Sequence, residues 1–133
     1  MRYLLDTNAV SDLIRNTGGN VRQAVQQVGV DAVCTSIIVS AELRYGARKR
    51  GSDELTGRVE GVLERLTVLP FEPPADHVYG ELRYMLEQQG TPISGNDLLI
   101  AAQALSGNLI VVTDNVREFS RVDGLVVENW LRP

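Results

Sequence analysis

The sequence contains very little cysteine or histidine. Its 133 residues include a single cysteine, Cys34, and a single histidine, His77. One cysteine excludes an internal disulfide framework, and one cysteine with one histidine cannot supply a structural zinc site. A chain of this length buries enough surface to fold without such cross-links. We expect Cys34 in the core and His77 on a helix surface.

The chain also lacks an excess of positive charge. It has 13 Lys and Arg residues against 17 Asp and Glu residues, which gives a formal net charge of −4. This balance argues against binding to nucleic acid or anionic membranes through bulk charge, but it says nothing about local basic patches. Hydrophobic residues make up 44% of the chain, too much for a disordered protein.

Long hydrophobic runs are absent as well. No stretch approaches the roughly 18 apolar residues that span a bilayer. The N-terminus reaches a charge at Asp6, which leaves no room for the apolar region of a signal peptide. We therefore expect a cytoplasmic protein that makes no membrane contact. The chain shows no internal repeat or linker, so residues 1–133 are expected to form one domain.

Short apolar runs alternate with helical patterns along the chain. Strands are expected at 2–5, 31–35, 67–69, 109–113 and 125–127. Helices are expected from a cap at Asp6 or Asn8 through Ile14, and at 21–28, 37–49, 53–65, 75–89 and 94–105. Strands separated by helices predict an α/β fold with a central parallel sheet of four to five strands flanked by helices. In such sheets, ligands bind at the carboxyl ends of the strands.

Two acidic residues directly follow expected strands. Asp6 comes after the first strand and Asp114 after the fourth, so both are expected to face the crevice where ligands bind. Each also has a simpler interpretation. Asp6 could cap the first helix, and Asp114 belongs to an Asp-Asn pair, which is common in turns.

Two more acidic residues lie within expected helices, on the side of apolar neighbours. Glu42 shares a helix face with Ile38 and Tyr45. Burying an ionised carboxylate without a partner costs several kcal/mol, so this position predicts a metal, a basic partner or a raised pKa, unless the carboxylate reaches water at the helix border. Asp97 repeats the pattern, although Ser94-x-x-Asp97 also resembles a capping box.

The four acids, Asp6, Glu42, Asp97 and Asp114, are expected to converge on one end of the parallel sheet. Like charges about 4 Å apart repel by about 4 kcal/mol at an effective dielectric constant of 20, so protonation or a cation must neutralise such a cluster. Because all the available ligands are oxygen atoms, the fitting cation is Mg²⁺ or Mn²⁺. These ions support phosphoryl chemistry by activating water.

Six strings of residues resemble, in order and spacing, the PIN-domain ribonucleases of the VapC toxin class. They are LLDTN at 4–8, SAELRYG at 40–46, SGNDLLIAAQAL at 94–105, VVTDN at 111–115, REF at 117–119 and GLVVENW at 124–130. The resemblance implies a PIN-like domain with Mg²⁺- or Mn²⁺-dependent endoribonuclease activity. It further implies the toxin half of a type II toxin–antitoxin pair, which arrests translation and growth by cleaving RNA. Transfer RNA is the leading candidate substrate.

The resemblance also implies roles for single residues. The first three acids of the family match Asp6, Glu42 and Asp97. The fourth acid of the family usually stands two residues after the Thr of a T-x-D motif, where this chain has Asn115, with its carboxylate at Asp114 instead. Either Asn115 is a neutral ligand or Asp114 swings into the site, and this departure favours one metal ion over two. Residues that match the family's polar supporting positions are Thr7, Asn8 and Thr113.

Partners follow from the same resemblance. Related toxins are inhibited by a VapB-type antitoxin whose C-terminal segment lies across the toxin's groove and whose other end binds operator DNA, and they commonly form homodimers. A basic stretch beside Glu42 suits contact with RNA because guanidinium binds phosphate bidentately. Its residues are Arg44, Arg48, Lys49 and Arg50. The same stretch is equally typical of a solvated helix end that complements the helix dipole.

Two other small α/β enzyme classes fail on specific residues. A receiver domain needs an Asp after the third strand, where this chain has Leu69 and Pro70. A phosphatase of the haloacid dehalogenase type needs Asp-x-Asp after the first strand, where the second acid is replaced by Asn8. A catalytically weak PIN module that only binds RNA or an antitoxin stays open as an alternative, because the fourth acid is shifted.

Overall fold

Five parallel strands form one sheet at the centre of the protein. The computed structural model describes residues 1–132 and gives the strand order β3-β2-β1-β4-β5. The strands are β1 (Tyr3–Leu5), β2 (Val33–Ser36), β3 (Thr67–Leu69), β4 (Ile110–Val112) and β5 (Val127–Glu128). Leu4 of β1 pairs with Cys34 of β2 on one side and with Val111 of β4 on the other. The predicted α/β fold with a parallel sheet is confirmed.

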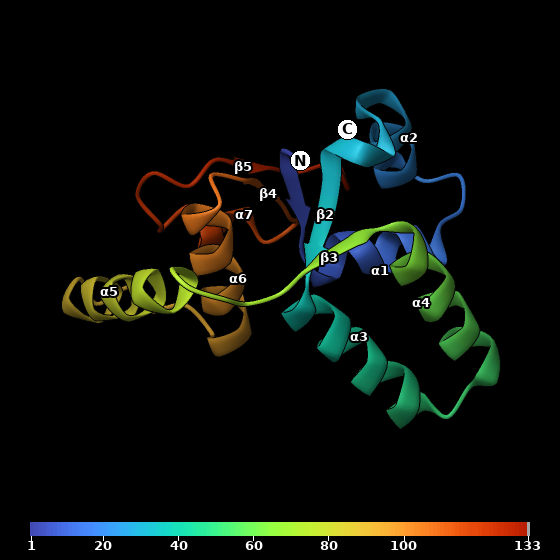
Figure 1. Cartoon of the computed structure of the whole chain (residues 1–133), viewed down its shortest axis with the longest axis horizontal. Coiled ribbons are helices and arrows are strands. Elements are labelled where there is room, and N and C mark those ends of the chain that lie inside the picture. The colour runs from blue at the N-terminus through green and yellow to red at the C-terminus, as the bar shows by residue number, and fades with distance from the viewer. Residues whose placement is uncertain (133) are drawn as a thin grey trace.

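Helices cover both faces of this sheet. They are α1 (Thr7–Arg15), α2 (Asn20–Val28), α3 (Ile37–Arg50), α4 (Asp53–Arg65), α5 (Ala75–Gln88), α6 (Gly95–Ser106) and α7 (Val116–Phe119). In Figure 1, α1, α2 and α4 lie on one side of the central strands, and α5, α6 and α7 lie on the other. Leu4, Leu5, Val111 and Val112 are fully buried, as expected for continuous apolar strands between two helical layers. None of the helices within residues 1–132 is long and apolar enough to cross a membrane.

Most element boundaries lie within one residue of the sequence-based expectation, but two strands begin later than expected and one helix was missed. The strand expected from residue 31 begins at Val33, because Val30–Ala32 form a 3₁₀ turn, η1, in which the Ala32 amide donates to the Gly29 carbonyl. The last strand begins at Val127 rather than 125, because Leu125 donates its amide to Val122 within a turn. Helix α7 was not predicted, since four residues are too few to show a helical period.

The order in which strands are added to the sheet reverses at β1. From β1 the chain proceeds to β2 and β3 on one side, and it then returns to β4 and β5 on the other. In sheets of this kind the crevice beyond the carboxyl ends of the strands on either side of the reversal is where ligands bind. Here the two strands are β1 and β4, which are followed by Asp6 and Thr113. The Asp6 amide donates to the Val112 carbonyl over 3.0 Å and so holds the two strand ends together.

A buried glutamine connects this edge of the sheet to α6. Gln103 is 5% exposed, and its Nε2 donates to the carbonyls of Leu69 (3.2 Å) and Pro70 (2.9 Å). The contact fixes α6 against the end of β3. Because α6 carries Asp97, the glutamine also fixes the height of that carboxylate relative to the sheet.

We expect Gln103→Ala to lower the free energy of unfolding by about 2 kcal/mol, because it leaves a cavity and removes the donor from two carbonyl groups. Chemical denaturation with a two-state fit measures this loss. The matched control is Gln27→Ala on the exposed face of α2, which should change the free energy by less than about 0.5 kcal/mol. Equal losses in the two variants would contradict the structural role of Gln103.

Candidate active site

Asp6 lies at the carboxyl end of β1 and caps α1. Its Oδ1 accepts a hydrogen bond from the Ala9 amide over 3.0 Å, and the residue is 2% exposed. Of the two caps considered from the sequence, Asp6 rather than Asn8 is the one observed. Burial raises the pKa of Asp6 to about 6, even though hydrogen bonds from Thr113 and the Ala9 amide lower it. Capping and a place in the crevice therefore coexist in the same residue.

Glu42 lies on α3 and faces the start of α1. The Thr7 hydroxyl donates to Glu42 Oε1 over 2.6 Å, which joins the two helices at the site. The carboxylate is half-buried, and its predicted neighbour Tyr45 is 66% exposed. The apolar stripe expected around Glu42 is therefore only partly buried. Its neighbour three residues earlier, Val39, is fully buried, whereas Tyr45 faces solvent.

Asp97 lies in the first turn of α6. Its Oδ2 accepts a hydrogen bond from Asn115 Nδ2 over 3.2 Å. Burial raises the pKa of Asp97, the Asn115 amide lowers it, and the negative charges of Glu118 and Glu42 raise it further. The charge of Asp97 in turn raises the pKa of Asp6. These charge effects indicate that Asp6, Glu42 and Asp97, which come from three separate parts of the chain, lie near one another.

Glu118 is a fourth acid at this place and was not predicted. It lies on α7, where its Oε1 accepts from the Ser94 amide (2.7 Å) and its Oε2 accepts from Asn115 Nδ2 (2.9 Å). Burial raises the pKa of Glu118, but these hydrogen bonds outweigh burial and hold the pKa below its usual range. Glu118 is the glutamate of the REF string at 117–119, one of the six strings that resemble the PIN-domain ribonucleases, so the sequence did contain a pattern that points to it.

The capping box expected at Ser94 and Asp97 does not form. In a capping box the acid in the first turn would accept from the Ser94 amide. Here Glu118 takes that hydrogen bond from a different element, and the Ser94 side chain makes no capping bond to the helix. The Ser94 hydroxyl still donates to Asp97 Oδ2 over 3.5 Å, but Asp97 does not accept from the Ser94 amide.

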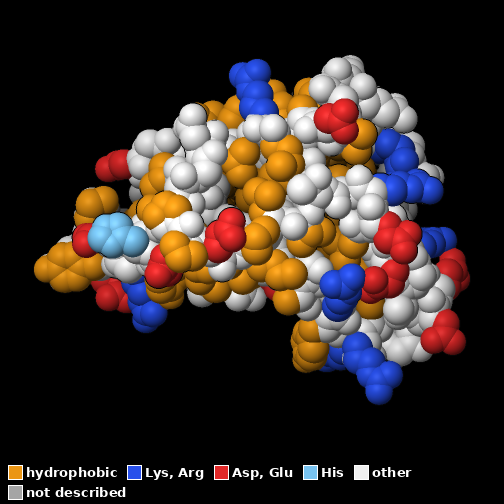
Figure 2. Space-filling model, in the orientation of Figure 1, with side chains coloured by type: hydrophobic (Ala, Val, Ile, Leu, Met, Phe, Trp, Pro, Cys, Tyr) orange, Lys and Arg blue, Asp and Glu red, His pale blue; other side chains and the backbone are white. Residues whose placement is uncertain are grey.

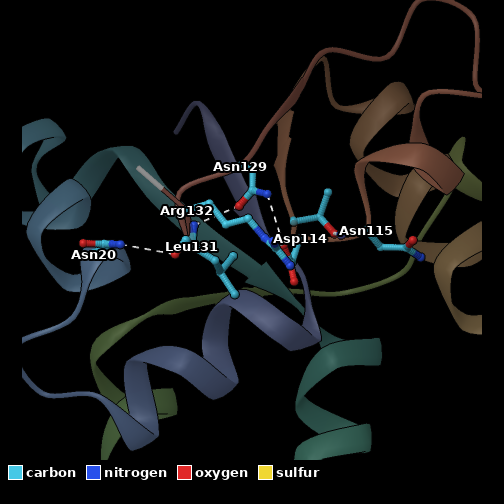
Figure 3. Close-up of polar contacts among 7 residues, drawn as sticks. Asn20, Asp114, Asn115, Asn129, Leu131 and Arg132 are labelled. Atoms are coloured by element: carbon cyan, nitrogen blue, oxygen red, sulfur yellow. Dashed lines mark hydrogen bonds and ion pairs between the residues drawn. The ribbon is translucent and has the colours of Figure 1, made fainter.

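Asp114 does not join the other acids. Its Oδ1 accepts from Arg132 Nε (2.9 Å) and Asn129 Nδ2 (3.1 Å), on the far side of the turn from Asn115. Figure 3 shows the side chains of Asp114 and Asn115 pointing in opposite directions. Of the two sequence alternatives for the fourth position, the structure puts Asn115 beside Asp97 and turns Asp114 away.

The supporting residues expected from the sequence fall into two groups. Thr7 binds Glu42, and the buried Thr113 lies beside Asp6 and accepts from the Asn115 amide over 2.8 Å. Asn8 is exposed and contributes only a backbone amide to Asp6. The expectations for the two residues outside the site also agree with the structure, since Cys34 is buried and His77 is exposed on α5.

The residues of the basic stretch also differ in their surroundings: Arg44 is paired with an acid, and the other three are exposed. Arg44 forms a bidentate pair with Glu60 of α4, with both N–O distances at 2.8 Å. Arg48, Lys49 and Arg50 are exposed at the end of α3, where Figure 2 shows basic side chains next to the acidic ones of α4. A groove of about 540 Å³ begins at Thr7 and Glu42 and runs past Arg50 between α1, α3 and α4.

The donor set at this edge fits a divalent cation. We refer to Asp6, Glu42, Asp97 and Glu118 as the acidic cluster. Throughout residues 1–132, no Lys or Arg side chain forms a salt bridge with any of these four. Within the same residues, no three Asp, Glu, His or Cys side chains already stand in a metal-holding arrangement. Each acid is instead hydrogen-bonded by neutral donors. Burial, more than any other cause, raises the pKa values of Asp6 and Asp97 and so disfavours their charged forms.

Comparison with known proteins places this arrangement in a family. The family model described as PIN domain matches residues 3–125. Ribonuclease VapC2 of Rickettsia felis is 36% identical over 132 residues, which cover 98% of each chain. The tRNA(fMet)-specific endonuclease VapC of Salmonella typhimurium is 37% identical over 131 residues, again 98% of each chain.

A solved structure extends the match to three dimensions. The crystal structure of VapBC2 from Rickettsia felis bound to a DNA fragment from their promoter contains a chain with a TM-score of 0.90 to this one. The two chains are 35% identical, and the match covers 98% of this chain and 99% of the other. Sequence and fold thus agree over nearly the whole length, and the chain belongs to the PIN domain family, among the VapC ribonucleases.

Proposed function

We propose that this protein is a Mg²⁺- or Mn²⁺-dependent endoribonuclease and the toxin of a toxin–antitoxin pair, acting in the cytoplasm. The observation that carries the proposal is the acidic cluster, whose carboxylates come from four places in the chain to the reversal of the sheet and, within residues 1–132, form no salt bridge with Lys or Arg. Such a group is expensive to hold as free anions and suits a divalent cation. The relative named as a tRNA(fMet)-specific endonuclease supports RNA as the substrate, with transfer RNA as its class.

Asp6, Glu42 and Asp97 would hold the ion. When bound, the ion polarises a phosphodiester and makes a water molecule a better nucleophile at neutral pH. The protein's own contribution is orientation. Thr7 fixes Glu42 and Asn115 fixes Asp97 by hydrogen bonds, as is typical of the residues that surround metal ligands.

We assign the fourth acidic position to Glu118 rather than Asp114. Glu118 shares Asn115 Nδ2 with Asp97, so the two carboxylates lie on either side of one amide group. Asp114 is held away by Arg132 and Asn129. A carboxylate at Glu118 completes the acidic cluster and, through the Ser94 amide, also fixes the first turn of α6.

A VapB-type antitoxin would regulate this site. A solved relative is a VapBC2 complex bound to a DNA fragment from their promoter, which supports an antitoxin partner and a complex that binds operator DNA. A homodimer within that complex is part of the proposal. The groove that starts at Thr7 and Glu42 offers an antitoxin segment a path to the acidic cluster. Its floor includes the apolar side chains of Leu43, Leu55 and Val59, which suit a partner segment better than they suit RNA phosphates.

Asp6→Asn and Asp97→Asn should each lower RNA cleavage by more than about 100-fold, beyond the loss typical of residues outside the ligand set. The assay incubates purified protein with transfer RNA and Mg²⁺ or Mn²⁺, with and without a chelator. The matched control is Asp76→Asn, which changes an exposed carboxylate on α5. This variant should cleave RNA like the wild type. Cleavage that survives the chelator, or equal cleavage by Asp6→Asn and the wild type, would refute the site.

Growth on expression tests the toxin role. Cells that produce the wild type should stop growing, and cells that produce Asp97→Asn at the same protein level should grow. Co-expression of the antitoxin encoded beside the protein should restore growth to the wild-type strain. Arrest that persists with Asp97→Asn would favour the alternative of a PIN module that acts by binding alone.

Glu118→Gln should reduce cleavage by roughly 10–100-fold, because it removes one negative charge and one of two strong acceptors around Asn115. The same RNA assay measures the loss, with metal concentration varied so that weaker metal binding appears as a higher requirement for Mg²⁺ or Mn²⁺. Glu87→Gln, on the exposed surface of α5, should leave the requirement unchanged. An unchanged requirement in Glu118→Gln would remove Glu118 from the acidic cluster.

Asp6→Asn should stabilise the metal-free protein at pH 7.5 by up to about 3 kcal/mol. The pKa of Asp6 is about 6 in the folded protein and 3.8 as a model value, so the folded state binds the proton more tightly. The contribution of Asp6 to the free energy of unfolding therefore falls as the pH rises from about 4 to about 6 and stays low above that range. The gain in Asp6→Asn, which keeps the helix cap, should disappear near pH 4.

Denaturation at several pH values measures this gain. Addition of Mg²⁺ or Mn²⁺ should raise the melting temperature of the wild type, because the ion binds only the folded state, and should have little effect on Asp6→Asn. A wild type that is as stable as Asp6→Asn at pH 7.5 in the absence of metal would show that the charge of Asp6 is already compensated.

A further inference from the structure

The turn that follows β4 has two sides with different partners. Thr113 and Asn115 face the acidic cluster, where Thr113 lies beside Asp6 and Asn115 donates to both Asp97 and Glu118. The residue between them faces the opposite way. Asp114 is one-third exposed and is bound by residues from the end of the chain.

We refer to residues 128–132 as the C-terminal segment. This segment forms hydrogen bonds with two successive residues of the turn, Thr113 and Asp114. The Glu128 carbonyl accepts from the Thr113 amide over 3.0 Å, which ends the β4–β5 ladder. Beyond the ladder, Asn129 and Arg132 both donate to Asp114 Oδ1, over 3.1 and 2.9 Å, as Figure 3 shows.

The C-terminal segment is itself anchored to the rest of the fold. The Leu131 amide donates to Asn129 Oδ1 (2.9 Å), and the Leu131 carbonyl accepts from Asn20 at the start of α2 (3.2 Å). The ring of Trp130 packs on that of Tyr3, with centroids 4.9 Å apart. Because the C-terminal segment is anchored, the donors that bind Asp114 are held in place. The turn that carries Asp114 therefore has little freedom to rotate.

We propose that Asp114 is a positioning residue that acts through Asn115. By binding Arg132 and Asn129, Asp114 fixes the conformation of the turn. The side-chain amide of Asn115 then stays between Asp97 and Glu118. The inference rests on the proposed function for its effect on cleavage, but the placement of Asn115 can be tested without it. The carboxylate that this chain carries one residue before the position of the family's fourth acid thus contributes from outside the site.

The geometry argues against a role for Asp114 as a ligand. To reach the acidic cluster, its side chain would have to leave both donors and cross to the side of the turn that Asn115 occupies. The amide nitrogen of Asn115 also donates to Thr113 Oγ1 over 2.8 Å, and that bond holds the present conformation of the turn. A positional role needs no such rearrangement.

The test compares Asp114→Ala, Arg132→Ala and the double variant. Each single variant should lower kcat for RNA cleavage by about tenfold, the lower end of the effect expected for residues that orient ligands, and should leave KM within about twofold. The double variant should be no slower than Asp114→Ala alone, because Asp114→Ala already removes the contact with Arg132. Glu87→Ala, which breaks the similarly exposed pair with Arg83 on α5, is the matched control and should keep the wild-type kcat.

A second readout follows Asn115 directly in metal-free protein. The side-chain amide signals of Asn115 in a ¹H–¹⁵N NMR spectrum are identified by their loss in Asn115→Ala. In Asp114→Ala and Arg132→Ala they should move towards the positions of an exposed asparagine, while the melting temperature stays near that of the wild type because exposed ion pairs add little stability. A general loss of structure would instead lower the melting temperature and shift many signals.

Two results would overturn the proposal. If Asp114→Ala abolishes cleavage while Arg132→Ala keeps the full kcat, Asp114 acts inside the site as a ligand. If both variants keep the kcat and the Asn115 signals of the wild type, the C-terminal segment does not position the site. Arg132 is 75% exposed, so Arg132→Ala carries the test if Asp114→Ala folds poorly. Should the wild type not cleave RNA at all, the Asn115 signals still decide whether the contact orients this residue.

Discussion

Burial and mutual repulsion of the acidic cluster, which lies beyond the carboxyl ends of β1 and β4, are the constraint that the rest of the site accommodates. Two like charges about 5 Å apart repel by about 3 kcal/mol at an effective dielectric constant of 20. In this protein burial has the larger effect and repulsion adds to it, so the pKa of Asp6 rises to about 6 and that of Asp97 rises as well. The fold therefore gives up stability where it gathers these acids, a cost that functional sites commonly carry.

Neutral hydrogen-bond donors orient the acids without cancelling their charge. Thr7 binds Glu42, the Ala9 amide binds Asp6, and Asn115 lies between Asp97 and Glu118. A lysine or arginine in any of these positions would satisfy the carboxylate permanently and leave no reason to bind a cation. The arrangement keeps the site anionic and still fixes each side chain, which is what an exchangeable divalent ion requires of its protein ligands.

The sequence predicts the acids whose positions depend on local structure. Asp6 follows an apolar strand, and Glu42 and Asp97 lie early in well-marked helices, so topology alone brings them to the same edge. Glu118 was missed because it lies on a four-residue helix that has no detectable period. The direction of Asp114 depends on Asn129 and Arg132, which are 15 and 18 residues further along the chain. A contact at that separation leaves no pattern in the sequence around it.

The net charge of −4 follows from the same site. The chain has 17 acidic and 13 basic residues, so the part outside the four acids of the cluster is formally neutral. The acidic surplus then belongs to the proposed cation site and does not oppose RNA over the rest of the surface. Arg44 is already paired with Glu60, which leaves Arg48, Lys49 and Arg50 as the exposed cations of that helix. Because Arg50 also lines the groove that begins at Glu42, RNA phosphates and an antitoxin segment would compete for the same approach to the acids.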